Sequence, residues 1–354
     1  MMSDRRIPVG IKGFSDGLWG GTQKFGWIQT LRGVATFLVF FSHQISLPIP
    51  RNLMFIIGRV GVTCFFLISG YLAISTRKKR NRRQYLINRF VRMYPVYWFI
   101  LGVTFVLYYS KWSLKELMIN MTLFEEFFGY DAILGSSWMM PIQVILFIGL
   151  LILGTRFFIP SPNNERNSKR GMLLMIICML GAIATGFIRL KTNKPFPVAI
   201  FLLLGVAMIG IYYRESEKAQ PLHCIIRMRR MVIIFEVGLV FSTLLGYKGD
   251  WILYFASYNI GISMFVLFQI VKIYNCQINK LFDKLGDIGF TFFLAGEIPL
   301  FVLNKIFPSE RSLPITIVFV LLNCVLLFFI SLLISNYIEK PIINLGHKLE
   351  KCVE

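Results

Sequence analysis

Residues 26–44, GWIQTLRGVATFLVFFSHQ, are an apolar run that contains two ionisable side chains, Arg32 and His43. A membrane-spanning helix needs about 20 predominantly apolar residues, and this run is long enough for one. On such a helix the two side chains would lie about 20° apart around the axis and roughly 16 Å apart along it. The spacing therefore predicts that Arg32 and His43 face one side of the helix and line an internal polar cavity crossing much of the bilayer.

The composition of the whole chain agrees with a membrane protein. Of its 354 residues, 56% are hydrophobic and 16% are charged, whereas a soluble domain is usually about 45–50% apolar and about 25% charged. The net charge of +20 would suit a nucleic-acid binder, but such a protein would be less apolar, so we expect no nucleic-acid partner. The six cysteines have neither disulfide-framework nor zinc-site spacing, and we expect no metal.

Apolar runs bounded by charged residues, Pro or Gly predict an all-α, polytopic membrane protein with about ten transmembrane helices. The predicted helices cover residues 27–47, 57–75, 94–110, 138–155, 171–188, 197–213, 231–247, 251–271, 287–304 and 313–335. Of the 38 Lys and Arg residues, 27 fall on the side of the N-terminus, which predicts that both termini are cytoplasmic.

Three segments follow from this threading. They are a cytoplasmic N-terminal segment over 1–26, a transmembrane domain over 27–335 and a cytoplasmic tail over 336–354. Between the third and fourth predicted helices, residues 111–137 form a long, partly polar connection, which predicts a short interfacial helix.

His43 is the only histidine within a predicted span. Near neutral pH an imidazole can take a proton from a hydroxyl and return it, which is the chemistry of a general base. An ionisable group in a span costs about 2.5–3.5 kcal/mol on insertion scales, so it is a candidate functional residue by default. The alternative interpretation is a structural histidine bonded to a neighbouring helix.

A second candidate lies in the basic stretch RKKRNRRQYLINRFVRMYPVYW, residues 77–98. Its first part, 77–83, is typical of a topological anchor on anionic lipid. Arg89 and Arg92 are spaced i, i+3 at the membrane entry, so their guanidinium groups share one helical face and could bind phosphate oxygens bidentately. We therefore expect a cytoplasmic, nucleotide-bearing donor to bind there.

Four further residues in predicted spans or at their ends carry weaker signals. Ser69 and Gly70 are small residues in the second predicted helix, where close helix packing is the favoured role. Glu297 lies in the ninth predicted helix and could orient or charge-balance the ionisable groups of the first. Glu339 precedes Pro341, and we expect the proline to stop the last helix and the glutamate to cap it or form a pair.

Four blocks of sequence, in order along the chain, resemble the family-3 membrane acyltransferases, which include bacterial O-acetyltransferases of O-antigen, exopolysaccharide and peptidoglycan. The blocks are IQTLRGVATFLVFFSH (28–43), GVTCFFLISGYL (61–72), RFVRMYPVYW (89–98) and NYIEKPIINLGHKL (336–349). Arg32 and His43 match the family's Arg and His separated by ten residues, and Arg89 and Arg92 match its R-x-x-R segment. The resemblance covers nearly the whole chain.

Two positions depart from the family pattern. Many members have a glutamate five residues after the tryptophan that precedes the fourth helix, where this chain has Gln143 after Trp138. An amide cannot act as a base, so only the position is carried over. Many members also have a histidine at the end of the ninth helix, where this chain has Gly296 and Glu297. We expect no C-terminal esterase-like domain of the kind that some relatives carry.

The resemblance implies transfer of an acyl group, most often acetyl, from acetyl-CoA to a hydroxyl of a cell-surface polysaccharide or lipid-linked sugar in the bacterial inner membrane. Arg89 and Arg92 would bind CoA, and Arg32 would guide the donor or stabilise the thioester oxygen. His43 would deprotonate the sugar hydroxyl or carry the acyl group transiently. No cofactor would be bound permanently, and the partners would be acetyl-CoA, the acceptor, membrane lipid and other glycan-assembly proteins.

Two other classes of protein fit some of the same features. A transporter or flippase of a lipid-linked saccharide would also have many spans, basic loops and an intramembrane arginine. A non-catalytic export subunit of the same fold would fit Gln143 and the missing histidine. The register of Arg32 and His43, together with the four blocks, favours the enzyme.

Overall fold

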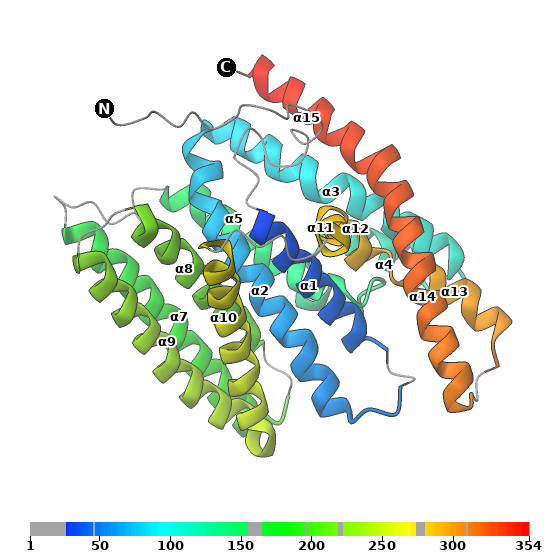
Figure 1. Cartoon of the computed structure of the whole chain (residues 1–354), viewed down its shortest axis with the longest axis horizontal. Helices are drawn as coiled ribbons and strands as arrows, with labels where there is room; N and C mark the ends of the chain where they lie inside the picture. Colours follow the sequence, from blue (N-terminus) through cyan, green and yellow to red (C-terminus); the bar gives the residue numbers. More distant parts are fainter. Residues whose placement is uncertain are drawn as a thin grey trace, which may run out of the picture.

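The computed structural model of the chain describes residues 26–44, 47–154, 165–194, 197–218, 222–273, 280–308 and 311–353. Within these ranges the regular elements are all helical, which confirms the all-α prediction (Figure 1). The helices are α1 (Gly26–Ser42), α2 (Arg51–Lys78), α3 (Arg82–Leu107), α4 (Leu114–Asn120), α5 (Met140–Leu153), α7 (Glu165–Thr192), α8 (Val198–Lys218), α9 (Leu222–Tyr247), α10 (Trp251–Ile273), α11 (Lys280–Asp287), α12 (Gly289–Leu294), α13 (Glu297–Ile306), α14 (Leu313–Ile334) and α15 (Lys340–Cys352).

Five stretches of the described residues are helical, long and apolar enough to span a membrane. They are Arg51–Ile74, Arg82–Leu107, Lys169–Thr192, Ile226–Ile270 and Leu313–Cys352. The fourth stretch holds two helices, α9 and α10, joined by a 3₁₀ turn at Lys248–Asp250. The chain is therefore a multi-pass membrane protein, while the count of ten spans and the cytoplasmic termini stay predictions.

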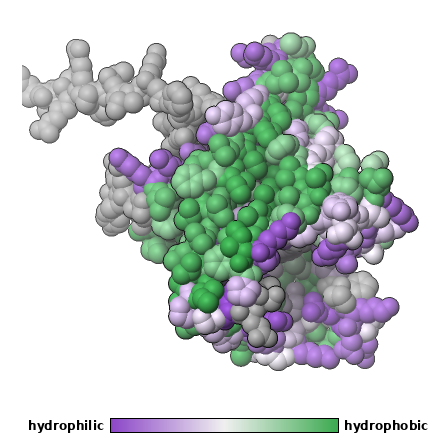
Figure 2. Space-filling view, turned by 90° about the vertical axis from the view of Figure 1, so that its right-hand side faces the viewer, coloured by the Kyte–Doolittle hydropathy of each residue, from purple (hydrophilic) through white to green (hydrophobic). Residues whose placement is uncertain are grey.

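The surface carries the apolar side chains that a lipid-facing protein needs. Figure 2 shows a broad hydrophobic band, with hydrophilic residues above and below it, on the side that lies at the right of Figure 1. On α14, large apolar side chains such as Leu321, Val325 and Phe329 are exposed. Because hydrocarbon can solvate such side chains and water cannot, this face suits a bilayer.

Helix α2 lies at the centre of the molecule and packs against α1, α8 and α10 (Figure 1). Its contact with α8 is a close approach of two backbones. A Cβ atom on Gly70 would lie 1.9 Å from the carbonyl oxygen of Ala207, and one on Gly210 would lie 2.2 Å from that of Leu67. Any larger residue would force the helices apart, so the packing role predicted for Gly70 is confirmed.

The contact between α1 and α11 is built in the same way. A Cβ atom on Gly33 would lie 1.9 Å from the carbonyl oxygen of Phe282, and one on Gly286 would lie 2.1 Å from that of Gln29. The Gln29 side chain also donates a hydrogen bond to Asp287. This contact fixes the helix that carries Arg32 against the segment that leads into α12.

The prediction of one continuous ninth helix over 287–304 is wrong. The segment instead forms α11, α12 and α13, separated at Ile288 and at Ala295–Gly296. Gly289 is the first residue of α12 and lies close to α1. A Cβ atom at this position would lie 2.6 Å from the Thr36 hydroxyl oxygen. The segment thus follows the surface of α1, which requires breaks that an apolar run does not reveal.

The prediction that Pro341 stops the last helix is also wrong. A π-helical turn at Ser335–Glu339 joins α14 directly to α15, and Pro341 lies in the first turn of α15. A proline lacks the N–H that an α-helix uses there, and its ring clashes with the carbonyl four residues earlier. The π-turn lies at that position, so the chain stays helical. The predicted tail over 336–354 is accordingly helical up to Cys352 and packs on α3.

Two segments that connect predicted spans contain helices. The basic stretch is helical up to Lys78 in α2 and again from Arg82 in α3, where Asn81 and Gln84 form a capping box. The short helix predicted within 111–137 is present as α4, and its own capping box joins Ser113 to Glu116. In both places the cap residues satisfy the first backbone N–H groups of the helix.

Candidate active site

Arg32, Arg89 and Arg92 line one cavity of about 130 Å³, which we call the arginine cavity. They come from α1 and from successive turns of α3, and Ser69 of α2 and Glu339 of the π-turn line the same space. The rest of the lining is Phe65, Ile68, Leu72, Met93, Met139, Met140, Gln143, Phe147, Gly289, Phe290, Phe293 and Ile343. The structure therefore brings together three arginines that lie far apart in the sequence.

The charges in the arginine cavity are unequal. Glu339 is the one carboxylate among the described lining residues; it is 3% exposed and interacts electrostatically with Arg32 and Arg92. The Arg89 guanidinium lies 4.0 Å from the centre of the Phe147 ring, and its buried Nε has no hydrogen-bond partner in the described part of the chain. Asp287 and Glu350 interact with Arg32 and Arg92 from outside the lining, and within the described lining three guanidinium groups face one carboxylate, which suits an anionic ligand.

Hydrogen bonds fix the neutral side chains around these charges. The Thr291 hydroxyl of α12 donates to Glu339 over 2.7 Å. The Gln143 amide of α5 donates to the Ser69 hydroxyl oxygen, also over 2.7 Å. Ser69 thus does more than allow close packing, because its hydroxyl lines the cavity and accepts from Gln143.

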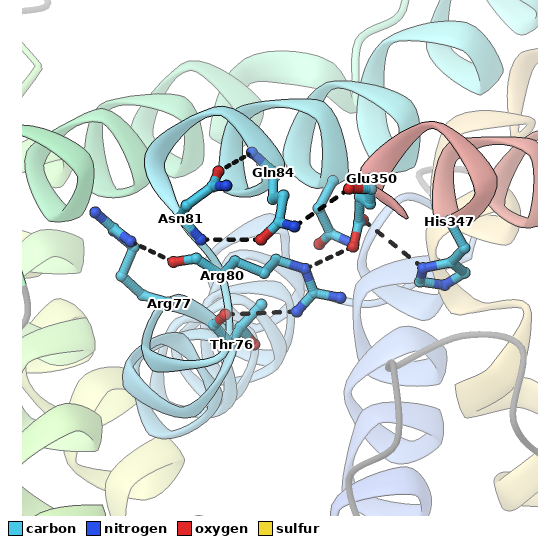
Figure 3. Close-up of polar contacts among 8 residues, drawn as sticks. Thr76, Arg77, Arg80, Asn81, Gln84, His347 and Glu350 are labelled. Carbon is cyan, nitrogen blue, oxygen red and sulfur yellow. Dashed lines mark hydrogen bonds and ion pairs between the residues drawn. The ribbon is translucent and has the colours of Figure 1, made fainter. Parts of the chain in front are cut away.

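The C-terminal helix holds the arginine-bearing helix through a polar cluster shown in Figure 3, which we call the Glu350 clamp. The Glu350 carboxylate accepts hydrogen bonds from Arg80 Nε over 2.9 Å and from Asn88 Nδ2 over 2.6 Å. Gln84 donates to the backbone carbonyl of Glu350 over 3.2 Å, and His347 Nδ1 lies 3.7 Å from the carboxylate. Because Asn88 directly precedes Arg89, the clamp fixes the turn of α3 from which the arginines project.

His43 lines a second, larger cavity of about 510 Å³, which we call the histidine cavity. Helix α1 ends at Ser42, so His43 lies in the turn that follows it. His43 Nδ1 lies 2.7 Å from the carbonyl oxygen of Val39. A carbonyl can only accept, so Nδ1 carries the hydrogen and Nε2 of the neutral ring has a free lone pair. That lone pair is what a general base needs.

The prediction that Arg32 and His43 share one cavity is wrong for the described residues. Phe293 of α12 is 8% exposed and lines both cavities. The 3₁₀ turn Ser137–Met139 contributes to both sides, Trp138 to the histidine cavity and Met139 to the arginine cavity. The two ionisable groups of α1 thus line different cavities, which meet at an aromatic side chain that no pattern in the first helix reveals.

A family model described as an acyltransferase domain matches residues 25–336, most of the chain. The chain belongs to the family-3 membrane acyltransferases. The matched range includes every lining residue of the histidine cavity, whereas Glu339 and the Glu350 clamp follow it. No curated protein and no solved structure matches the chain.

Glu297 does not reach the arginine cavity of the acyltransferase. It is the first residue of α13 and lines a third cavity of about 460 Å³ together with Lys111, Trp112 and Asp131. The Tyr108 hydroxyl donates to its backbone carbonyl over 3.4 Å. Glu297 therefore lies at a polar opening at the other end of α3, and its carboxylate interacts electrostatically with His43, one of the two ionisable groups that it was expected to charge-balance.

Three arginines that line a cavity of the acyltransferase were not predicted as candidate site residues from the sequence. Arg51, Arg59 and Arg189 counted only as charges outside the predicted cytoplasmic segments, yet all three line the histidine cavity with His43. Arg59 lies eight residues inside α2, a position within a candidate span that should have marked it. Arg189 comes from α7, and no spacing along the chain connects it to the others. In the described part of the chain, no group of three His, Cys, Asp or Glu side chains could hold a metal ion.

Proposed function

We propose that this acyltransferase moves an acyl group, typically acetyl, from cytoplasmic acyl-CoA to a hydroxyl of a cell-surface saccharide in the bacterial inner membrane. The observation that carries the proposal is the pair of cavities along α1. Arg32 lines a cationic cavity, and His43, at the other end of the helix, presents a free imidazole nitrogen to a second cavity. The first suits an anionic donor, and the second suits a hydroxyl that must lose its proton.

The arginine cavity supplies the donor site in this proposal. Pockets for drug-sized ligands measure about 300–1,000 Å³, so about 130 Å³ would accept only part of an acyl-CoA. Arg89 and Arg92 would bind phosphate oxygens, and the rest of the nucleotide would lie toward the basic stretch 77–83. Membrane lipid would meet the same stretch.

The separation of the two cavities supports one of the two roles considered for Arg32. Along α1, Arg32 and His43 are roughly 16 Å apart, so one carbonyl cannot contact both. Arg32 would therefore hold the donor rather than stabilise the thioester oxygen at the moment of transfer. The thioester end of the donor would pass Phe293 to reach the histidine cavity.

The transfer itself needs one base in the histidine cavity. His43 Nε2 would take the proton of the acceptor hydroxyl, and the oxygen would attack the thioester carbonyl. The tetrahedral intermediate would then lose the CoA sulfur as the C–S bond breaks, and the imidazolium would return the proton to that sulfur. If His43 instead carried the acyl group, labelled acetyl-CoA alone would leave a label on the protein.

The decisive experiment is His43→Ala, compared with the unchanged protein at equal membrane abundance. We expect the acetyl content of the surface glycan to fall to background, because general-base catalysis contributes about 10²–10⁴-fold. Retained acetylation would contradict the role of His43. Loss of surface glycan with normal acetyl content per sugar would instead favour a transporter or an export subunit.

A further inference from the structure

The histidine cavity contains two arginines placed over a pair of stacked tyrosine rings, and we call these four side chains the Arg–Tyr stack. The rings of Tyr247 and Tyr254 are stacked with their centroids 3.4 Å apart. The Arg59 guanidinium carbon lies 3.5 Å from the centre of the Tyr254 ring, and that of Arg189 lies 4.7 Å from the centre of the Tyr247 ring. Two cations from α2 and α7 therefore flank a pair of aromatic rings from α9 and α10.

No carboxylate among the described lining residues balances these cations. The described lining residues include Arg51, Arg59 and Arg189 but neither Asp nor Glu. No ion pair of these arginines occurs in the described ranges, and Arg59 Nη1 reaches the Ser257 hydroxyl oxygen only over 3.5 Å. The nearby Asp250 accepts from Asn52 over 3.3 Å and is not among the lining residues.

Stacking leaves an arginine free to bind an anion. The ring contacts one face of the planar guanidinium, while the N–H groups point outward in its plane and can donate to two oxygens at once. A cation held in a membrane helix without a counter-ion is unfavourable, and such groups mark substrate or ion sites. The Arg–Tyr stack thus holds two preorganised anion donors in the cavity that contains His43.

We propose that the histidine cavity binds its acceptor through an anionic group, a phosphate or a carboxylate on the saccharide, held by Arg59 and Arg189. This inference rests on the proposed function, because the bound saccharide is taken to be the acceptor of the acyl group. The arginines hold the anion at the stack, and the hydroxyl to be acylated meets His43 Nε2 elsewhere in the same cavity. A neutral saccharide would leave both guanidinium charges without a counter-ion.

The test is equilibrium dialysis with the full chain in nanodiscs of phosphatidylcholine. Radiolabelled glucose 1-phosphate, glucuronate and glucose serve as probes. We expect the two anionic sugars to bind at least tenfold more tightly than glucose. The double variant Arg59→Gln/Arg189→Gln should lose that preference, since each charge-assisted pair contributes roughly tenfold or more. Equal binding of all three sugars, or an unchanged preference in the double variant, would overturn the proposal.

Two further variants complete the test. Arg311→Gln is the matched control, because Arg311 also stacks on a ring, at 3.7 Å from the centre of Phe319, but lies outside the histidine cavity. It should keep the preference for anionic sugars. Loss of CoA binding would show that the double variant has misfolded, and Arg59→Lys then replaces it. We expect Arg59→Lys to weaken the binding of anionic sugars by about threefold or more, because lysine lacks the forked donor of arginine.

A final comparison separates the sugar from a lipid headgroup as the source of the anion. If the two arginines served phosphatidylglycerol, no sugar would bind in phosphatidylcholine, and phosphatidylglycerol would be retained only by chains with Arg59 and Arg189. That outcome would overturn the proposal. The proposed function fails separately, through acyl transfer by His43→Ala, and that result would leave the sugar-binding measurement intact.

Discussion

Both the arginine cavity and the histidine cavity contain guanidinium groups, but the surroundings of these groups differ. In the first, three guanidinium groups lie in about 130 Å³ around a carboxylate, Glu339, that the protein supplies itself. In the second, about 510 Å³ holds guanidinium groups that are supported by tyrosine rings and face no carboxylate of the described lining. A fixed internal anion suits a site that keeps one donor in place, whereas a larger cavity with stacked cations suits a bulky acceptor.

The two cavities also share a boundary. Phe293 lines both cavities and the turn around Trp138 contributes to each, and we call this boundary the wall between the cavities. Each cavity is assembled from helices that lie far apart in the sequence, with α1 as a shared element. Variants that affect one cavity should therefore leave ligand binding in the other unchanged.

The largest expected effect is the loss of donor binding in Arg89→Gln/Arg92→Gln. Each arginine would contribute about 1.5–3 kcal/mol through charged hydrogen bonds, so the Kd for acetyl-CoA should rise by about 100-fold or more. Isothermal titration with CoA measures this directly. The binding of anionic sugars should stay within about twofold. A parallel loss of both ligands would show that the two cavities are not independent.

A smaller effect is expected from Glu350→Gln in the Glu350 clamp. The amide cannot accept from Arg80 and Asn88 as strongly, so the turn of α3 before Arg89 should loosen. We expect the KM for acetyl-CoA to rise by about five- to tenfold with the KM for the acceptor unchanged. Lys351→Ala, an exposed neighbour on α15, is the control. An unchanged donor KM would mean that the clamp does not position the arginines.

Phe293→Leu tests the wall between the cavities. A smaller side chain would widen the passage, so water should reach the thioester more often. We expect CoA release without acceptor to increase by about two- to fivefold, measured with a thiol reagent, while the thermal midpoint falls slightly because apolar packing is lost. Unchanged release would indicate that Phe293 does not control access.

The smallest effect concerns Glu125, which supports the same wall from the connection before α5. Burial raises the pKa of its carboxyl, and Ser137, next to Trp138, donates to it over 3.0 Å. A raised pKa in the folded state means that stability is fully present below the ordinary value of about 4.3 and is lost as the pH rises through the folded pKa. The Tm of the unchanged protein should therefore fall more over this range than that of Glu125→Gln. Parallel Tm curves would contradict this.

The sequence alone predicted the helices better than their contacts. The spans predicted from apolar length over 57–75, 171–188 and 251–271 lie within α2, α7 and α10. Hydropathy along the chain determines where a span can lie. The break of the ninth predicted helix depends on Gly286 and Gly289, whose partners Gln29 and Thr36 lie more than 250 residues earlier. A local pattern cannot contain that information.

The same limit applies to the site. Arg32, Arg89 and Arg92 were singled out by their unusual positions, and the structure places them in one cavity. The position of Arg59 inside a span could have marked that residue, but the Arg–Tyr stack could not be anticipated, because Arg59 and Arg189 belong to different helices and no spacing connects them. Only the packing of α2, α7, α9 and α10 brings them to the cavity of His43.

The π-turn at Ser335–Glu339 has a consequence for insertions and deletions. A π-turn absorbs one residue more than an α-turn, whereas removing one residue from the first turns of α15 would rotate everything after it by about 100°. Glu350 would then point away from Arg80 and Asn88, although every side chain of the clamp was still encoded. The C-terminal helix should accordingly tolerate many substitutions on its outer face but very few changes in length.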